Sequence, residues 1–327
     1  MRKVLITGAT GFIGYEVARQ LAGRGADARL LVRRPQRAPL VRPLGLELVS
    51  GDLLSPPSLE RALEGVDTVI HLGARAAFES YRRLAPTIVE GTRTLVDRAV
   101  DAGVEQFVFG SSLRVYGSQS RPIGRDTEAD PVIDYGRAKL DAERLLSERA
   151  AASGLGLGVV RLPHVYGARD LMFERVQAGT LAMVGAGTNA YAHLHVEDAA
   201  RVLIGCAEQR WRGVSAVGDD RPATWEEFIE VLRWMYPRFR VVKVPKWLAS
   251  LGTHLLRPLV TLRRRPTLLT PDMVTGWSLE LPVEPGLLWD ELGLAPRYPT
   301  IDEGLPAALD DCVEFRWRHP LADPVPY

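Results

Sequence analysis

The 327-residue sequence has little that would indicate a secreted, metal-binding or membrane-spanning protein. Its two cysteines, Cys206 and Cys312, lie far apart and form no ligand spacing. This usage fits a reducing compartment and argues against a disulfide framework or a zinc site. No window holds the roughly 18 uninterrupted apolar residues that a membrane span needs. The first apolar run stops after three residues, so no signal peptide can be read there, and we expect a cytoplasmic protein.

An excess of charge of one sign is also missing. The net charge is +1, which gives no electrostatic reason to expect nucleic acid as a partner. With 46% hydrophobic and 25% charged residues, the composition is that of an ordinary globular protein. The length favours two domains, or one domain with a large lobe. A small-molecule substrate is the expected partner.

The most informative stretch that is present is a glycine loop shortly behind the apolar run Val4–Ile6. Gly8, Gly11 and Gly14 are spaced three apart, and a helical pattern follows. Such a loop lets bare backbone N–H groups and a helix N-terminus face a pyrophosphate. A plain turn between strand and helix is the alternative. The residues predicted to hold the dinucleotide here are Thr7, Gly8, Thr10, Gly11, Phe12, Ile13 and Gly14.

The first half of the chain alternates short apolar runs with helical patterns, which predicts a doubly wound parallel sheet of the Rossmann type. The predicted strands are Val4–Ile6, Ala28–Val32, Glu47–Val49, Thr68–Leu72, Gln106–Gly110 and Gly158–Arg161, and the predicted helices are Tyr15–Gly23, Ser58–Leu63, Ala85–Ala102, Tyr135–Ala152 and Trp225–Tyr236. We expect residues 1–165 to form the cofactor domain, rejoined by about 193–217. Residues 166–327 would be mainly a smaller substrate lobe with a proline-rich tail, which we expect to lack regular structure from Trp317 to Tyr327.

Two features bear on which dinucleotide is bound. The second predicted strand is followed by Arg33 and Arg34, and no carboxylate occurs before Glu47. A 2′-phosphate matches the arginine fork, whereas NAD enzymes place an acidic residue here, so NADP is favoured over NAD. A solvated basic turn would look the same. Asp52, after the third strand, could bond the adenine edge or serve in a turn.

Tyr135 and Lys139 stand four apart and would share one helix face. The chain has only four lysines and nine tyrosines, and random placement would give about 0.1 such pairs. A lysine charge lowers the pKa of a nearby phenol toward the range of a proton-transfer group. Ser112 ends a predicted strand, at the sheet edge where open α/β folds bind ligands. Its hydroxyl could hold a substrate carbonyl or could simply satisfy backbone groups.

In this order the motifs resemble the extended short-chain dehydrogenase/reductase (epimerase/dehydratase) family, and within it the 3β-hydroxysteroid dehydrogenase and dihydroflavonol reductase branches. The segments that carry the resemblance are Thr7–Gly14, Gly51–Leu53, His71–Ala74, Gly91-Thr92, Ser111–Gly117, Tyr135–Lys139, Arg161–Gly167, His195–Asp198 and Asp290–Pro296. The resemblance implies Ser112, Tyr135 and Lys139 as the catalytic residues. It adds Leu53, Leu72, Gly73, Ala74, Leu162 and Val165 to the cofactor site and suggests a dimer formed through two long helices.

One position departs from the family pattern. Where members often carry an asparagine that supports a proton relay, this chain has Ile88, which cannot form a side-chain hydrogen bond. Either water and backbone replace the relay, or the helix is locally bent and Thr87 substitutes.

The expected activity is interconversion of a ketone and a secondary alcohol on a largely apolar substrate, with NADP(H) as cofactor. A nucleotide-sugar 4-epimerase or dehydratase with tightly held NAD is the first alternative, and a non-catalytic NADP(H) sensor is the second. The apolar segment Trp247–Leu262 favours a wall or lid over the pocket, although contact with a membrane surface is conceivable. His193 and His195 would share a strand face, but without a third ligand no metal site is expected.

Overall fold

The computed structural model describes residues 1–75, 77–253 and 270–318, and its N-terminal part is built around one sheet. Seven strands lie in the order β11–β6–β5–β4–β1–β2–β3, and every neighbouring pair is parallel. Their bounds are β1 Val4–Thr7, β2 Ala28–Val32, β3 Glu47–Ser50, β4 Thr68–His71, β5 Gln106–Ser112, β6 Gly156–Leu162 and β11 Gly213–Ala216. The predicted Rossmann-type sheet is therefore confirmed.

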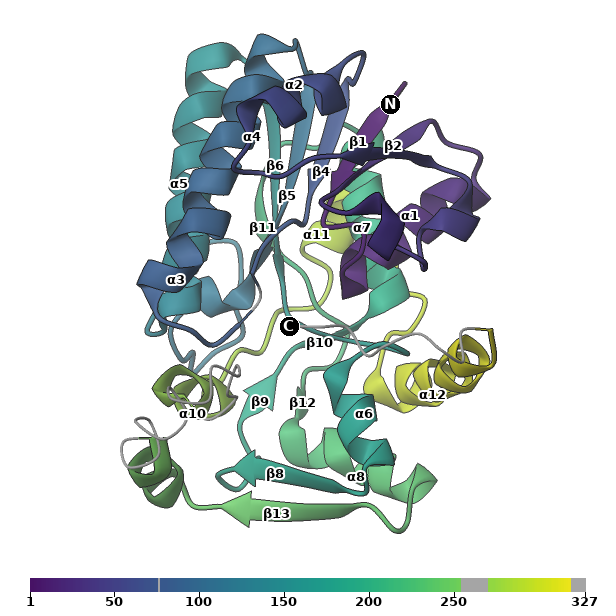
Figure 1. Cartoon of the computed structure of the whole chain (residues 1–327). Helices are drawn as coiled ribbons and strands as arrows, with labels where there is room; N and C mark the ends of the chain where they lie inside the picture. The colour runs from purple at the N-terminus through teal and green to yellow at the C-terminus, as the bar shows by residue number, and fades with distance from the viewer. Residues whose placement is uncertain (76, 254–269, 319–327) are drawn as a thin grey trace.

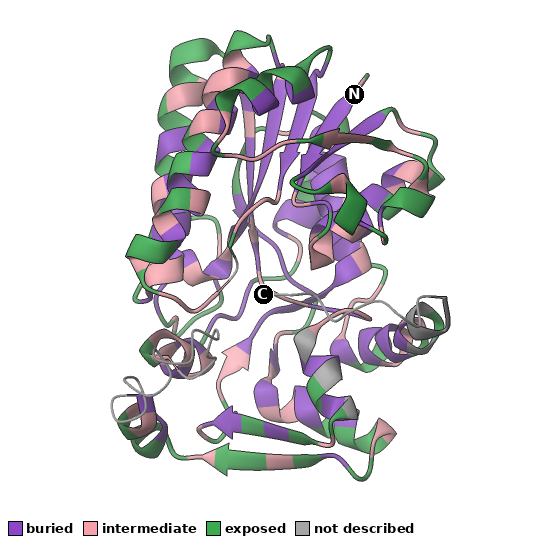
Figure 2. Cartoon of the chain, in the orientation of Figure 1, coloured by how far each residue is buried: buried purple, intermediate pink, exposed green. Residues whose placement is uncertain are grey.

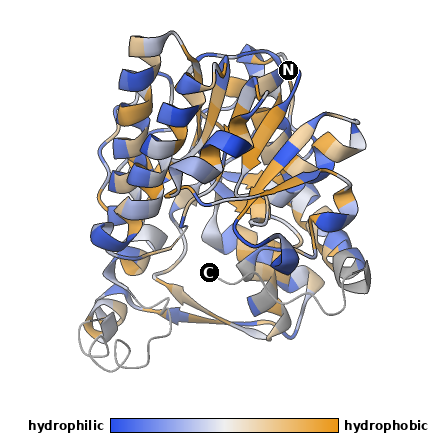
Figure 3. Cartoon of the chain, turned by 45° about the horizontal axis from the view of Figure 1, so that its top comes forward, coloured by the Kyte–Doolittle hydropathy of each residue, from blue (hydrophilic) through white to orange (hydrophobic). Residues whose placement is uncertain are grey.

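Helices cover both faces of this sheet (Figure 1). One face carries α1 (Phe12–Gly23) and α7 (Val196–Glu208), and the other carries α2 (Pro56–Leu63), α4 (Gly91–Asp101) and α5 (Asp134–Ser153). The central strands are consequently buried along their length (Figure 2) and read as continuous apolar runs in the sequence (Figure 3). After β6 the chain leaves the sheet, and it returns with α7, which packs against α1, and with β11, which pairs with β6.

The predicted helix Ala85–Ala102 is present, but it begins earlier and is not a regular α-helix throughout. The structure has α3 (Tyr81–Ala85), a π-helical turn over Pro86–Glu90, and then α4. Proline at 86 has no N–H to donate to the preceding turn, which interrupts the regular hydrogen-bond ladder. The hydroxyl of Thr92 donates to the carbonyl of Ile88 at 2.5 Å and so bridges the turn to α4.

The remaining elements form a smaller lobe beyond the carboxyl edge of the sheet, drawn at the bottom of Figure 1. Its three two-stranded sheets pair β10 with β7, β12 with β9 and β13 with β8. The strands of the lobe are β7 His164–Tyr166, β8 Thr180–Val184, β9 Ala190–Tyr191, β10 His193–His195, β12 Ala223–Thr224 and β13 Arg240–Val244, and its helices are α6 Leu171–Gln177, α8 Trp225–Met235, α10 Pro271–Trp277 and α12 Ile301–Arg318. The short helix α11 (Leu288–Glu291) lies instead beside α7, in the core that α1 and α7 form with the sheet. Aromatic side chains, among them Tyr166, Tyr191 and Phe228, fill the core of the lobe.

Of three predictions for this lobe, one lies wholly within the described residues and two extend beyond them. The predicted helix Trp225–Tyr236 is present as α8. In the apolar segment Trp247–Leu262, residues 246–253 are helical and 254–262 lie outside the described part. The tail prediction is wrong for residues 317 and 318, which belong to α12, and 319–327 also lie outside it. Within the described ranges, no helix is both long and apolar enough to cross a bilayer.

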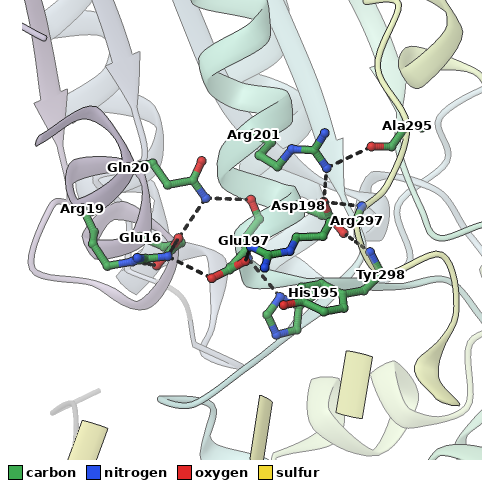
Figure 4. Close-up of polar contacts among 10 residues, drawn as sticks. All are labelled: Glu16, Arg19, Gln20, His195, Glu197, Asp198, Arg201, Ala295, Arg297 and Tyr298. Atoms are coloured by element: carbon green, nitrogen blue, oxygen red, sulfur yellow. Dashed lines mark hydrogen bonds and ion pairs between the residues drawn. The ribbon is translucent and has the colours of Figure 1, made fainter. Parts of the chain in front are cut away.

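A polar network joins the first helix to the far end of the chain (Figure 4). The fully buried carboxylate of Asp198 accepts from the Arg201 side chain at 2.6 Å and from the backbone N–H groups of Arg297 and Tyr298 at 2.8 and 2.9 Å. Its neighbour Glu197 pairs with Arg19 of α1 at 2.9 Å and with Arg297 at 2.8 Å. The network therefore holds α1, α7 and the 295–298 segment together.

Candidate active site

The glycine loop lies where the strand order reverses, between β1 and its neighbours β2 and β4. Gly8 has φ +75°, and a Cβ there would come within 2.6 Å of the Leu72 backbone. A Cβ on Gly14 would overlap the carbonyl oxygen of Gly8, and Gly11 is the N-cap of α1. Only glycines allow this loop to pack so closely, and the arrangement leaves the N-terminus of α1 facing the crevice where a pyrophosphate binds in such folds. The residues present fit a dinucleotide.

At the expected adenosine end, Arg33 and Arg34 directly follow β2 and are both exposed. Asp52 is partly buried, and its Oδ1 accepts a hydrogen bond from the backbone N–H of Leu54 at 2.9 Å. This is the turn role that the sequence left open for Asp52. Leu53 packs close to Gly73 and Gly91, and so lines the joint between β4 and α4.

A buried chain of hydrogen bonds with a defined direction runs behind the glycine loop. The Thr92 hydroxyl donates to a carbonyl, so it accepts from Nε2 of His71 at 2.9 Å. Nδ1 of His71 is then the acceptor for the Thr7 hydroxyl at 2.6 Å, and Thr7 in turn accepts from the backbone N–H of Gly73 at 3.0 Å. Burial, aided by Lys139, lowers the pKa of His71 to about 3, which keeps the ring neutral as this chain requires.

The three predicted catalytic residues come from two neighbouring elements. Ser112 ends β5, whereas Tyr135 and Lys139 lie in the first turns of α5. The buried Lys139 Nζ donates to the carbonyl of Gly110 at 2.7 Å and lies 4.5 Å above the ring of Phe109. The lysine thereby ties α5 to the end of β5.

The segment between Ser112 and Tyr116 brings a further cation to Tyr135. Burial raises the pKa of Tyr135 to about 12, and the opposing cation is Arg114 rather than Lys139. Arg114 lies 4.4 Å above the ring of Phe78, and its backbone carbonyl occupies the space left by the missing side chain of Gly136. Sequence reasoning passed over Arg114 because nothing in its local pattern indicated that it faces α5.

Burial also lowers the pKa of Lys139 to about 8, against the opposing charge of Glu143. Glu143 anchors a second network that the sequence did not reveal. Its carboxylate forms a buried ion pair with Arg161 of β6, with a shortest contact of 2.7 Å, and accepts from the hydroxyl of Ser111. Arg161 also donates to the hydroxyl of Tyr116 at 2.7 Å. These contacts hold the end of β5, which carries Ser112, against α5 and β6.

The other predicted residues have packing positions around this edge. Leu72 approaches Gly8 and Gly110, and Leu162 packs in the core between the sheet and α1. Val165 pairs with Leu194 in β7–β10. Thr10, which is exposed, accepts through its carbonyl from the side chain of Arg169 at 3.3 Å, so Arg169 is a cation at the glycine loop that the sequence did not indicate.

His193 and His195 both lie buried in the aromatic core of the lobe. His193 stacks on Phe228, with ring centroids 4.8 Å apart, and His195 packs against Tyr298 at 4.2 Å. The described residues contain no group of three potential metal ligands. His195 instead caps α7, where its Nδ1 accepts from the N–H of Glu197 at 3.3 Å.

Comparisons with known proteins agree with this arrangement. The model of the NAD dependent epimerase/dehydratase family matches residues 4–216. A ceramide reductase from Caulobacter vibrioides is 30% identical over 249 residues, covering 74% of this chain and 73% of its own. A Stigmatella aurantiaca ketoreductase, which acts on 4-hydroxy-2-methyl-3-oxo-4-farnesyl-3,4-dihydroquinoline-1-oxide, is 27% identical over 93% of this chain and 95% of its own.

Among solved structures, the dTDP-glucose 4,6-dehydratase DesIV from Streptomyces venezuelae with NAD bound has the same fold. Its TM-score is 0.79 at 24% identity, over 98% of this chain and all of its own. The sheet order, the glycine loop and the family match together identify an NAD(P)-dependent enzyme. The chain belongs to the NAD-dependent epimerase/dehydratase family, the extended type of short-chain dehydrogenase/reductase.

Proposed function

We propose that this protein is an NADP(H)-dependent reductase that converts a ketone on a largely apolar substrate into a secondary alcohol, with Ser112, Tyr135 and Lys139 as its catalytic residues. The observation that carries the proposal is the hydrogen bond from Lys139 to Gly110, two residues before Ser112. It ties the tyrosine-bearing end of α5 to the strand end that carries the serine.

When bound, the dinucleotide supplies the hydride. The chain's own residues handle the carbonyl oxygen: the Ser112 hydroxyl donates to it and orients it, and Tyr135 delivers the proton. With a pKa raised to about 12 by burial, the Tyr135 phenol keeps its proton at neutral pH, as a donor for reduction must. Arg114 opposes that rise and so eases release of the proton. Lys139 would hold the ribose next to the nicotinamide through the hydrogen bonds that its ammonium can donate.

Two arginines support NADP(H) over NAD(H). Arg33 and Arg34 follow β2, where a 2′-phosphate would lie, and both are exposed. In the described part of the chain neither side chain has an ion-pair partner, so both are available to a phosphate.

An apolar substrate is supported by the relatives and by the lobe. The ceramide reductase and the ketoreductase of the farnesyl-bearing quinoline act, by their names, on molecules with long hydrocarbon chains. In this protein Phe78 lies against Arg114 and Gly276, so α10 approaches the catalytic residues. Val274 of α10 also packs with Val184 and Ala249 of the lobe.

An epimerase or dehydratase acting on a nucleotide sugar with tightly held NAD is the second candidate, favoured by the fold shared with DesIV. A sensor without turnover is the least favoured, because the serine, tyrosine and lysine are all present.

We further propose a cytoplasmic homodimer formed through α4 and α5.

The direct test is NADPH consumption with a panel of long-chain 3-oxo compounds, sterols and nucleotide sugars. A reductase oxidises NADPH in step with alcohol formation, whereas an epimerase interconverts sugars without net change in NADPH. Tyr135→Phe should lower kcat by at least about 100-fold, since it removes the proton donor but keeps the ring. Unchanged turnover in this variant would contradict the assignment of the site.

The cofactor preference has its own test. Replacing Arg33 and Arg34 by serine should raise the Kd for NADPH at least tenfold and leave that for NADH nearly unchanged. Arg37→Ser, a loss of an exposed cation three residues further on, is the matched control. Equal losses for both cofactors would contradict the preference for NADP(H).

A further inference from the structure

The basic residues of this chain are distributed very unevenly. Between Glu230 and Asp272 the sequence has nine lysines and arginines and no acidic residue. That stretch carries +9 in a chain whose net charge is +1, so the remainder carries −8. In the described part, its cations are Arg233, Arg238, Arg240, Lys243 and Lys246, and all five are exposed.

These cations have little to neutralise them. Lys243 pairs with Glu226 at 2.5 Å. The other four have no ion pair with any residue of the described ranges. A local excess of this size, left uncompensated, attracts a polyanionic partner.

Large apolar side chains are exposed on the same elements. Eight large hydrophobic residues are exposed in the described structure, and five of them fall within 18 residues of sequence: Trp234 (79% exposed), Val242 (53%), Trp247 (69%), Leu248 (45%) and Leu251 (46%). They come from the end of α8, from β13 and from the helix 246–253. Figure 1 shows β13 and this helix along the edge of the lobe farthest from the seven-stranded sheet.

The helix 246–253 has its apolar residues on the outer side. Its buried residues are the small Ala249 and Thr253, four apart on one face. Trp247, Leu248 and Leu251 point away from the protein, against the usual amphipathic pattern of a surface helix. Exposure of this apolar helix face to water is unfavourable in free energy. Contact with an apolar phase would remove that penalty.

We propose that these five side chains and the neighbouring cations form a surface, the basic-apolar edge, that docks on an anionic lipid bilayer. Tryptophan and leucine insert at the acyl boundary, while lysine and arginine contact lipid headgroups. A nucleic acid would contact the cations and could stack its bases on the indole rings. It would gain little from Val242, Leu248 and Leu251, because aliphatic side chains do not stack with bases. The proposal is independent of the enzymatic assignment.

Vesicle flotation of the full chain tests this docking. The purified protein is mixed with vesicles of phosphatidylcholine alone, or of phosphatidylcholine with an equal amount of phosphatidylglycerol, at low salt and at 0.5 M NaCl. We expect binding to the anionic vesicles at low salt, at least tenfold weaker binding to the neutral ones, and loss of binding at high salt.

Two sets of variants separate the contributions. Trp247→Ser/Leu248→Ser/Leu251→Ser removes insertion, and Arg240→Glu/Lys246→Glu reverses two cations; each should weaken binding at least about tenfold. The matched controls are Val214→Ser, an exposed residue at the sheet edge, and Arg144→Glu on α5, which should bind as the wild type does. Circular dichroism checks that every variant folds.

Three results would overturn the proposal. They are no binding to anionic vesicles at low salt, equal binding by the wild type and both variant sets, or a loss of binding in Val214→Ser and Arg144→Glu as large as in the two variant sets. Tighter binding to a single-stranded oligonucleotide that is insensitive to the serine variants would assign the surface to nucleic acid instead and would equally overturn it.

Discussion

Among the described residues, Arg114 is the cation whose charge opposes the effect of burial on the pKa of Tyr135. Arg114→Gln should raise the pKa of the Tyr135 phenol further, because the charge opposing its burial is removed. Alcohol oxidation requires the tyrosinate, so its rate profile should move to higher pH in this variant. Arg114→Lys should restore much of the profile. A profile that stays in place in Arg114→Gln would show that the guanidinium does not act on the phenol.

Thr7 lies at the start of the buried hydrogen-bond chain through His71. Thr7→Val keeps the shape but leaves the N–H of Gly73 and Nδ1 of His71 without partners. We expect a loss of about 1–3 kcal/mol in the free energy of unfolding, measured in urea. Thr94→Val is the control, since its hydroxyl bonds a carbonyl on an exposed face of α4. Equal small losses in both variants would show that the hydrogen bonds of Thr7 to His71 and Gly73 do not stabilise the fold.

At the level of the element, the Glu143–Arg161 pair holds α5 against β6 behind the catalytic residues. Glu143→Gln would leave the buried guanidinium of Arg161 without its anion, at a cost of about 3–5 kcal/mol. The measurement is again urea unfolding, with the exposed Glu148→Gln on the same helix as control. A loss no larger than that of the control would mean that water or Tyr116 replaces the carboxylate.

The elements also show what sequence can and cannot predict. The glycine loop, β1 and α5 were predicted because their signals are local: Gly8 needs positive φ, and apolar residues mark buried strands. The π-helical turn over Pro86–Glu90 was foreseen only as a possible local bend at Ile88, because the apolar pattern continues through the turn. Arg114 and Glu143 could not be identified as site residues, because their partners are defined only by the packing of α5 on β5 and β6.

At the level of the whole molecule, Asp219 should make stability depend on pH. It is 1% exposed, and its burial raises the pKa of the carboxyl to about 8. The unfolded chain releases this proton near pH 4, so the stabilising contribution is complete below that pH and is lost as the pH rises toward 8. From this group alone, the free energy of unfolding should fall by up to about 1.4 kcal/mol per pH unit between pH 5 and 8.

Asp219→Asn should flatten that dependence, as followed by urea unfolding at pH 5, 6, 7 and 8. The exposed neighbour supplies the control, since Asp220→Asn should leave the slope nearly unchanged. If the slope were the same in Asp219→Asn as in the wild type, the proton uptake would have to lie elsewhere.

The network around Asp198 has a consequence for the order in which the protein is made. The cofactor loop and α1 leave the ribosome before their partners do, because Glu197 follows Arg19 of α1 by nearly two hundred residues and the segment from 295 to 298 comes a further hundred later. The polar network that holds α1, α7 and this segment together is therefore incomplete until residues 295–298 have been made. Because contacts between distant parts of a chain form slowly, we expect this network to be completed only after the segment from 295 to 298 has left the ribosome.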